Sequence, residues 1–341
     1  MTHPVTILTG FLGSGKSTLL NRLLRAPEMG DAAVIINEFG EIPIDHLLVE
    51  SSIENATVLQ NGCICCTLRG DLVDTLLDLE AKRATGAIPA FNRVVIETTG
   101  LADAAPILHT LLYNTDIAGR YSVGSVIATA DAVNLLAQLP RFAETHRQLA
   151  FANVVALTKT DLVDGAQAER TRAAIRAINP AANILSVVNG NTDVAALLAG
   201  SGTPDEASLR DWLAADAYRP ADPHDHDHDH HGHGVSHHAD DIHSCCATWE
   251  TPLDLDRFKR WLSAIASLRG ANLLRVKGVV NIAGIAEPVV VQGVQHVLYP
   301  PVRLRAWPDA DRRTRIVFIT QGLPENAIRS SLGYLGKCDG G

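Results

Sequence analysis

The chain has 341 residues, of which 46% are hydrophobic and 20% are charged, and its formal net charge is −9 at pH 7. This length corresponds to about two domains of roughly 150 residues, and the apolar fraction is sufficient for a buried core in each. The acidic balance argues against nucleic acid or an anionic membrane as a partner. No apolar run reaches the about 18 residues that a membrane span needs. The N-terminus lacks a secretory signal, so we expect a cytoplasmic protein.

Residues 5 to 18, VTILTGFLGSGKST, contain the most informative pattern. The pattern G-x-x-x-x-G-K-[ST] stands between a strand-like run and a helix-like run, where glycines let backbone N–H groups converge on a phosphate. Lys16 is expected to contact the β- and γ-phosphates and to take part in catalysis, and the hydroxyl of Ser17 is expected to bind Mg²⁺. The candidate nucleotide-binding residues of this loop are Gly10, Gly13, Ser14, Gly15, Lys16, Ser17 and Thr18.

Residues 1–203 alternate strand-like and helix-like patterns. The expected strands cover residues 5–8, 33–36, 94–96, 123–130, 154–157 and 184–187. Fully apolar strands separated by amphipathic segments, such as 71–82 and 166–178, favour an α/β fold with a doubly wound parallel sheet of the P-loop NTPase type. Ligands of such sheets bind outside the carboxyl ends of the strands, so the functional motifs are expected directly after the strands.

The motif Glu97-Thr-Thr-Gly100 ends one of these strands. Glu97 is expected to hold Mg²⁺ through water and to serve hydrolysis, and the N–H of Gly100 is expected to sense the γ-phosphate. The pattern is weak in isolation, but it stands where a P-loop fold requires it.

The motif Thr158-Lys-Thr-Asp161 follows another strand and resembles the guanine-specifying [NT]-K-x-D element. The Asp161 carboxylate would accept hydrogen bonds from N1 and N2 of guanine, a donor pair that adenine lacks, and the stem of Lys159 would pack along the base. The alternative is that Asp161 is only the N-cap of a helix. Asn189, after the next strand, is a further candidate for the base pocket.

An acidic loop and a cysteine cluster suggest a metal site. Cys63, Cys65 and Cys66 present thiolates at i, i+2 and i+3, which can converge on one ion such as Zn²⁺, Co²⁺ or Cu⁺. Glu41 or Glu38, from the loop after residues 33–36, is a natural supplier of the missing ligand, and a metal there would lie one loop away from the γ-phosphate. The alternatives are buried structural cysteines and an ordinary acidic loop.

Residues 204–244 have little apolar content and are expected to form a flexible linker. Nine of the 14 histidines fall between His224 and His243, interleaved with aspartates, a composition suited to loose binding of divalent metals. The alternative is a solubilising spacer. The candidate ligands in this tract are His224, His226, His228, His230, His231 and His233.

Residues 245–341 predict a second, smaller α+β domain, with helices on one face of an antiparallel sheet. The expected strands cover residues 246–250, 273–283, 288–299 and 315–319, and the expected helices cover residues 254–268 and 324–332. Trp249, Trp261 and Trp307 are interpreted as core or interface anchors.

The motifs TGFLGSGKST, INEFG, GCICC, ETTG and TKTD, in this order, closely resemble the YjiA-type members of the CobW family of P-loop GTPases, and LRVKG and VQGVQ are similar to that family's C-terminal domain. The resemblance implies a slow GTPase that binds Zn²⁺ or Co²⁺ and couples GTP and Mg²⁺ to metal delivery to a client metalloprotein. By the same resemblance, Cys63, Cys65 and Cys66 with Glu41 hold the transferable metal. Some relatives have a glutamate where this chain has Ile36, which leaves the full ligand set open.

Two other functions are compatible with parts of the sequence. A metal buffer or storage protein would use the His tract and carry a vestigial nucleotide site, and a kinase would bind ATP in the same loop. The sequence offers no hydroxyl nucleophile with a histidine base and no identifiable catalytic glutamine or arginine finger, so we expect slow hydrolysis.

Overall fold

The computed structural model describes residues 2–29, 31–36, 49–53, 56–59, 64–67, 72–198, 242–270, 272–307, 310–323 and 325–335. Between residues 49 and 67, the backbone of three strands is described without its side chains. The chain folds into two compact units, one built on a nine-stranded sheet and the other on a six-stranded sheet. Each unit is described by itself.

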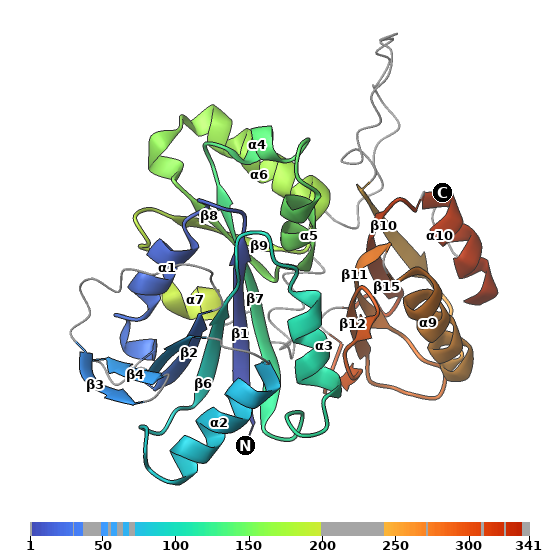
Figure 1. Cartoon of the computed structure of the whole chain (residues 1–341). Helices are drawn as coiled ribbons and strands as arrows, with labels where there is room; N and C mark the ends of the chain where they lie inside the picture. Colours follow the sequence, from blue (N-terminus) through green and yellow to red (C-terminus); the bar gives the residue numbers. More distant parts are fainter. Residues whose placement is uncertain are drawn as a thin grey trace. The chain divides into compact units, whose positions relative to one another are not determined.

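The N-terminal sheet has the strand order β3-β4-β5-β2-β6-β1-β7-β8-β9 (Figure 1). From β5 to β9 every neighbouring pair is parallel, which confirms the doubly wound sheet. The strands are β1 (His3–Gly10), β2 (Ala32–Ile36), β3 (Val49–Ile53), β4 (Ala56–Leu59), β5 (Ile64–Thr67), β6 (Arg93–Glu97), β7 (Tyr121–Asp131), β8 (Val154–Thr158) and β9 (Asn183–Val187).

The edge hairpin β3–β4 extends the sheet in antiparallel fashion beyond β5, and it was not predicted. Its sequences VESSI and ATVL are only five and four residues long, and polar residues interrupt the apolar ones in both. Neither sequence has the continuous apolar run that reveals the central strands, so this pattern could not indicate the hairpin.

Helices cover both faces of this sheet. In β2, Ala32, Val34 and Ile36 pack on one side with α1 and α7, whereas Ala33 and Ile35 pack on the other with α2 and α3. This two-sided burial explains why the central strands are apolar throughout. The helices are α1 (Lys16–Leu23), α2 (Leu72–Ala84), α3 (Ala105–Tyr113), α4 (Leu135–Gln138), α5 (Ala143–Phe151), α6 (Gly165–Ile178) and α7 (Val194–Leu198), with short 3₁₀ turns η1 (Pro27–Met29) and η2 (Thr160–Leu162).

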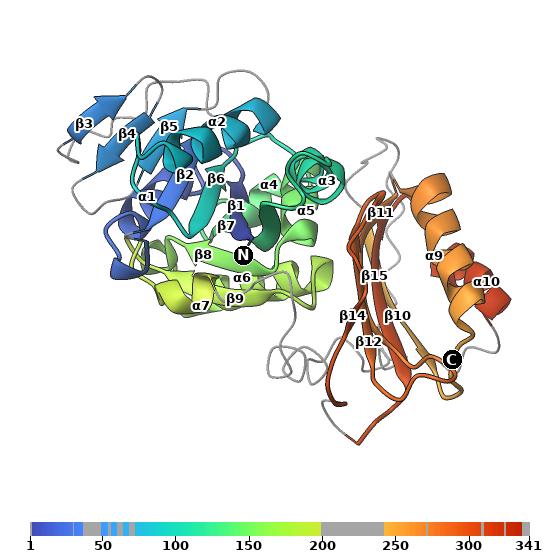
Figure 2. The same cartoon turned by 90° about the horizontal axis from the view of Figure 1, so that it is seen from below.

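The C-terminal sheet is antiparallel, with the order β10-β15-β11-β12-β13 and β14 paired to β12. Figure 2 shows α9 and α10 on the same side of this sheet, so the predicted α+β arrangement is confirmed. The elements are β10 (Ile242–Trp249), α9 (Leu255–Arg269), β11 (Leu273–Val280), β12 (Val289–Val294), β13 (Val297–Leu298), β14 (Val302–Arg303), β15 (Thr314–Gln321), α10 (Glu325–Leu332) and η4 (Gly333–Leu335).

Tryptophans anchor the core of this unit as predicted. Trp249 is fully buried, and Trp261 packs edge-on against Phe318 with ring centroids 5.8 Å apart. Trp307 is half-buried and donates from Nε1 to Ala286 O. The first strand, β10, begins at Ile242 rather than at the predicted Cys246, because backbone pairing with β15 continues through the polar residues His243 and Ser244.

Candidate functional site

The phosphate loop joins β1 to α1 and has the curled backbone that its glycines predict. Gly13 and Gly15 have φ angles of 70° and 95°, which lie in the left-handed region that glycine adopts at little cost. Gly10 has no room for a side chain, since a Cβ atom would overlap Thr129. The loop therefore presents its backbone N–H groups at the start of α1, as an anion-binding loop does.

Ser14 ties the loop to neighbouring strands. Its hydroxyl donates to Phe11 O over 2.6 Å and shares a hydrogen bond of 2.6 Å with Thr129 Oγ1 on β7. Its carbonyl accepts from Thr158 Oγ1, at the end of β8, over 2.7 Å. Ser14 and Thr158 thus connect the phosphate loop to β7 and β8 by hydrogen bonds. The sequence alone does not assign this role to them.

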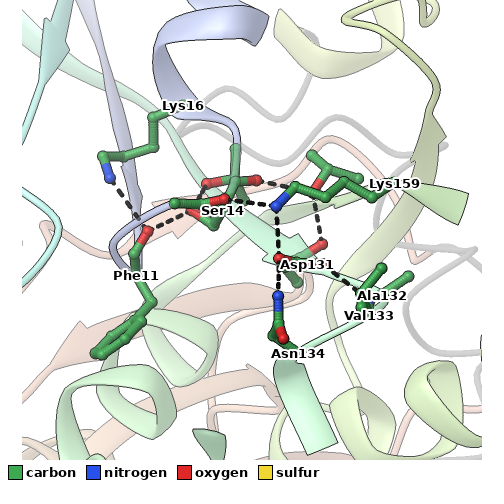
Figure 3. Close-up of polar contacts among 12 residues, drawn as sticks. Phe11, Ser14, Lys16, Asp131, Ala132, Val133, Asn134 and Lys159 are labelled. Carbon is green, nitrogen blue, oxygen red and sulfur yellow. Dashed lines mark hydrogen bonds and ion pairs between the residues drawn. The ribbon is translucent and has the colours of Figure 1, made fainter. Parts of the chain in front are cut away.

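The ammonium of Lys16 lies against the carbonyls of its own loop. Nζ donates to Gly10 O over 2.9 Å and to Phe11 O over 3.3 Å, and the residue is buried (Figure 3). A loop that already encloses the cation needs little reorganisation to offer it to a phosphate.

Ser17 and Glu97 come together at the other side of the loop. Ser17 Oγ donates to Glu97 Oε1 over 3.1 Å, and Glu97 is completely buried at the end of β6. Hard oxygen ligands of this kind suit Mg²⁺, so the two side chains fit the ion for which the sequence proposes them.

Gly100 packs directly on the phosphate loop. A Cβ atom on Gly100 would lie 2.6 Å from Leu12 Cδ2 and 2.8 Å from Leu12 N, so only glycine fits. Gln148 on α5 fixes the same segment by donating from Nε2 to Gly100 O and, at 3.3 Å, to Ala102 O. The loop after β6 is therefore in contact with the phosphate loop, as a nucleotide sensor requires.

Lys159 connects the segment after β8 to the phosphate loop. Its Nζ donates to Gly13 O over 2.9 Å and to Asp131 Oδ2 over 2.7 Å (Figure 3). Asp131 ends β7 and is 2% exposed. Burial raises the pKa of Asp131, but hydrogen bonds from Lys159, Asn134 and the N–H of Val133 outweigh it and hold the pKa below its ordinary value.

Asp161 lies exposed in the 3₁₀ turn η2, beside this cluster in sequence. The N-cap of α6 is Asp164, whose Oδ1 accepts from Gln167 N over 2.7 Å. The alternative that Asp161 merely caps this helix is therefore wrong, and its carboxylate stays a candidate for guanine recognition.

Asn189 lies in a tight turn after β9, with a φ of 51° and an exposed side chain. The next residue, Gly190, packs on α1, because a Cβ atom there would lie 3.0 Å from Thr18 O and 2.9 Å from Arg22 Cβ. The turn thus lies against the helix that follows the phosphate loop.

The proposed metal ligands fall mostly outside the described residues. This holds for Glu38, Glu41 and Cys63 and for the six histidines of the tract between residues 224 and 233. Cys65 and Cys66 are placed only by their backbone, within β5 and opposite Val34 and Ile35. The functional motifs were expected directly after strands, whereas these two cysteines lie within a strand, since parallel pairing with β2 extends through both.

Two features are absent from the part of the chain that the structure describes. It contains no group of three or more histidine, cysteine, aspartate or glutamate side chains suited to hold a metal ion. It also contains no helix long and apolar enough to cross a membrane.

Asp131 and Gln148 are the site residues that sequence reasoning missed. Asp131 follows the expected strand 123–130 directly, so the rule that placed functional residues after strands would have found it. Gln148 gives no such signal, because it lies within a helix and acts through tertiary contacts.

Comparison with known families identifies both parts of the chain. Residues 4–186 match the CobW/HypB/UreG nucleotide-binding domain, and residues 242–335 match the cobalamin synthesis protein cobW C-terminal domain. A zinc chaperone from Escherichia coli K12, YjiA, is 34% identical over 98% of each chain. The zinc chaperone CobW from Pseudomonas aeruginosa is 32% identical, over 96% of this chain and 90% of its own.

A solved structure agrees with the fold of the whole chain. The Zn(II)-bound YjiA GTPase from Escherichia coli superimposes with a TM-score of 0.77 at 32% identity, and the match covers 99% of this chain and 100% of that one. A Zn(II)-bound triple mutant of the same GTPase gives a TM-score of 0.78 at 31% identity.

Proposed function

The chain is a P-loop GTPase that belongs to the CobW family, and we propose that it binds Zn²⁺ at its cysteine cluster and uses the GTP cycle to deliver the ion to a client metalloprotein. The observation that carries the nucleotide part is the convergence of Lys16, Ser17, Glu97 and Lys159 on one phosphate loop. The metal part is supported by the C-x-C-C sequence and by the zinc-chaperone names of the relatives.

Each residue of the site has a distinct task in this proposal. Lys16 turns from the loop carbonyls to the β- and γ-phosphates, and the backbone N–H groups of residues 13–18 hold the phosphate oxygens. Ser17 binds Mg²⁺ directly and Glu97 binds it through water. The ion neutralises charge on the phosphates when it is bound.

Guanine recognition falls to Asp161, with Thr158, Lys159 and Asn189 around it. A carboxylate that accepts from two base donors leaves those donors unpaired with adenine, which sets the preference for GTP over ATP. We expect slow hydrolysis unless a partner or the bound metal assists it, because the sequence identifies no arginine finger or catalytic glutamine.

Zn²⁺ is the cargo in this proposal, held by Cys63, Cys65 and Cys66 with Glu41 or Glu38. Co²⁺ suits the same ligands and stays an alternative. GTP with Mg²⁺ tightens metal binding and hydrolysis weakens it. By linkage, metal binding then changes GTP affinity by the same factor.

The test is a competitive zinc titration of the full chain with GTP–Mg²⁺ or with GDP–Mg²⁺. Wild type is expected to hold one tight ion whose affinity is higher in the GTP state, and Cys65→Ala is expected to lose that site. Cys246→Ala, which removes a thiol from β10, is the matched control and should behave as wild type. Equal zinc affinity in both nucleotide states would refute the coupling.

The His tract supports a second candidate, a metal buffer. Residues such as His224, His226 and His228 would then bind most of the metal, and nucleotide would be irrelevant to it. Deletion of residues 222–238 separates the two functions. Survival of the tight, nucleotide-dependent site favours delivery, whereas loss of all zinc binding favours storage.

A further inference from the structure

The ends of β7 and β8 bring an acidic and a basic side chain together. The two strands are parallel neighbours, with Asp131 opposite Thr158, and Ala132 N donates to Thr158 O over 3.0 Å. Lys159 follows Thr158 directly. The register therefore places the Asp131 carboxylate beside the lysine of the guanine motif.

The carboxylate of Asp131 is held in place by hydrogen bonds from groups other than Lys159. Its Oδ1 accepts from Val133 N over 2.8 Å, and its Oδ2 accepts from Asn134 Nδ2 over 2.8 Å. The side chain is 2% exposed. Backbone and side-chain donors close in sequence thus fix the carboxylate, and Oδ2 accepts a further hydrogen bond from the ammonium of Lys159 (Figure 3).

Lys159 is constrained at both ends. Its backbone has a φ of 57°, a left-handed conformation that a non-glycine residue rarely adopts. Its ammonium bridges Asp131 Oδ2 and Gly13 O. A lysine side chain has four rotatable bonds, so an unfixed one would lose freedom when a nucleotide binds against it.

We infer that Asp131 is a positioning residue of the nucleotide site, which holds the Lys159 ammonium against Gly13 O and so fixes the guanine-binding segment on the phosphate loop. Asp131 acts through Lys159 and contacts neither base nor phosphate. The inference rests on the proposed binding of GTP at this site. It adds Asp131 as a residue that pre-organises the site for the nucleotide.

The test is a double-mutant cycle with Asp131→Asn and Lys159→Met in the full chain, with GTP and GDP titrated by calorimetry in Mg²⁺. An amide at position 131 turns an NH₂ group toward either Lys159 or the N–H of Val133, so at least one contact is lost. We expect Asp131→Asn to lower the affinity for GTP and for GDP about tenfold, which corresponds to the loss of one hydrogen bond to a charged group. In the Lys159→Met background, the same change should alter affinity by less than about twofold.

A purely structural role predicts another outcome. Asp131→Asn would then weaken binding by the same factor in both backgrounds, and this result would overturn the inference. Asp164→Asn is the matched control, because it removes the same charge from a carboxylate that caps α6. Its affinities should stay within about twofold of wild type.

Asp131→Glu keeps the test decisive if Asp131→Asn does not fold. The charge is retained, but the extra methylene displaces the ammonium from Gly13 O, so an affinity loss of about threefold is expected, again only when Lys159 is present. Unchanged affinity would refute the positioning role. The wild type alone tests the proposed function: if it shows no preference for GTP over ATP, the proposed GTP site is wrong. This result is separate from the comparison of variants, which tests the positioning role.

Discussion

Ser17 Oγ and Glu97 Oε1 lie 3.1 Å apart, although 80 residues separate them in the sequence. The phosphate loop supplies the hydroxyl and the end of β6 supplies the buried carboxylate. Two oxygen ligands suited to Mg²⁺ are thus pre-assembled by the parallel pairing of β1 with β6.

Glu97→Gln tests this arrangement. The amide keeps the size of the side chain and can still accept from Ser17, but it lacks the charge that holds a metal-bound water. We expect the kcat for GTP hydrolysis to fall roughly tenfold to a hundredfold, and half-maximal activity to require more Mg²⁺. Steady-state hydrolysis across a magnesium titration measures both.

Glu80→Gln is the control for this experiment. Glu80 is also buried, but it pairs with Arg83 on α2, away from the phosphate loop. Its kcat should match that of wild type. A Glu97→Gln enzyme with an unchanged magnesium requirement would contradict the assignment.

Asp161→Asn is expected to relax the preference for guanine. Replacing the carboxylate by an amide weakens one charge-assisted hydrogen bond to the base and places a donor against a donor. The ratio of GTP to ATP affinity should fall by about tenfold to a hundredfold. Competition between the two nucleotides measures this ratio, and a wild type that binds both equally would show that the motif was misinterpreted.

The pKa of Asp131 predicts how stability depends on pH. Because its folded-state pKa lies below the ordinary 3.8, the folded protein binds this proton less tightly than the unfolded chain does. The stabilisation is therefore complete above about pH 4 and is lost as the pH falls through the folded-state value. Denaturant unfolding between pH 2 and 6 measures the difference in free energy of unfolding between wild type and Asp131→Asn. This difference should shrink as the pH falls. A difference that stays constant would contradict the lowered pKa of Asp131.

Asn179 makes a prediction about stability alone. This fully buried residue is the C-cap of α6, and its Nδ2 donates to Leu149 O, Ala150 O and Ala152 O, at and just after the end of α5. Asn179→Ala is expected to lower the free energy of unfolding by about 2–3 kcal/mol, since buried carbonyls lose their donor.

Asn179→Asp should be more harmful at neutral pH, because a carboxylate would face the carbonyl oxygens. Urea unfolding with a common m-value checks both variants. An aspartate variant as stable as wild type would show that these contacts contribute little.

The nucleotide site was largely predictable because its residues form a local pattern. Lys16, Ser17 and Glu97 stand at fixed offsets from apolar strands, and strand order places them together. Asp131 was harder to find, since an acid after a strand is common and only the adjacency of β7 and β8 shows its partner.

The cysteine-bearing strand shows where the sequence was insufficient. No strand was predicted at Cys65 and Cys66, but an extra antiparallel hairpin makes β5 an interior strand, with neighbours on both sides. Neither of the short sequences of β3 and β4 has the continuous apolar run from which the central strands were predicted, so the sequence does not indicate that pairing.

The strand order also bears on the proposed coupling between nucleotide and metal. β5 and β1 are separated by β2 and β6, and three steps of about 4.8 Å place their axes about 14 Å apart. The two intervening strands pair with each other and connect β5 to β1, so they offer a mechanical route for the proposed coupling. Substitutions in β2 that leave every ligand intact would then uncouple zinc affinity from the GTP cycle.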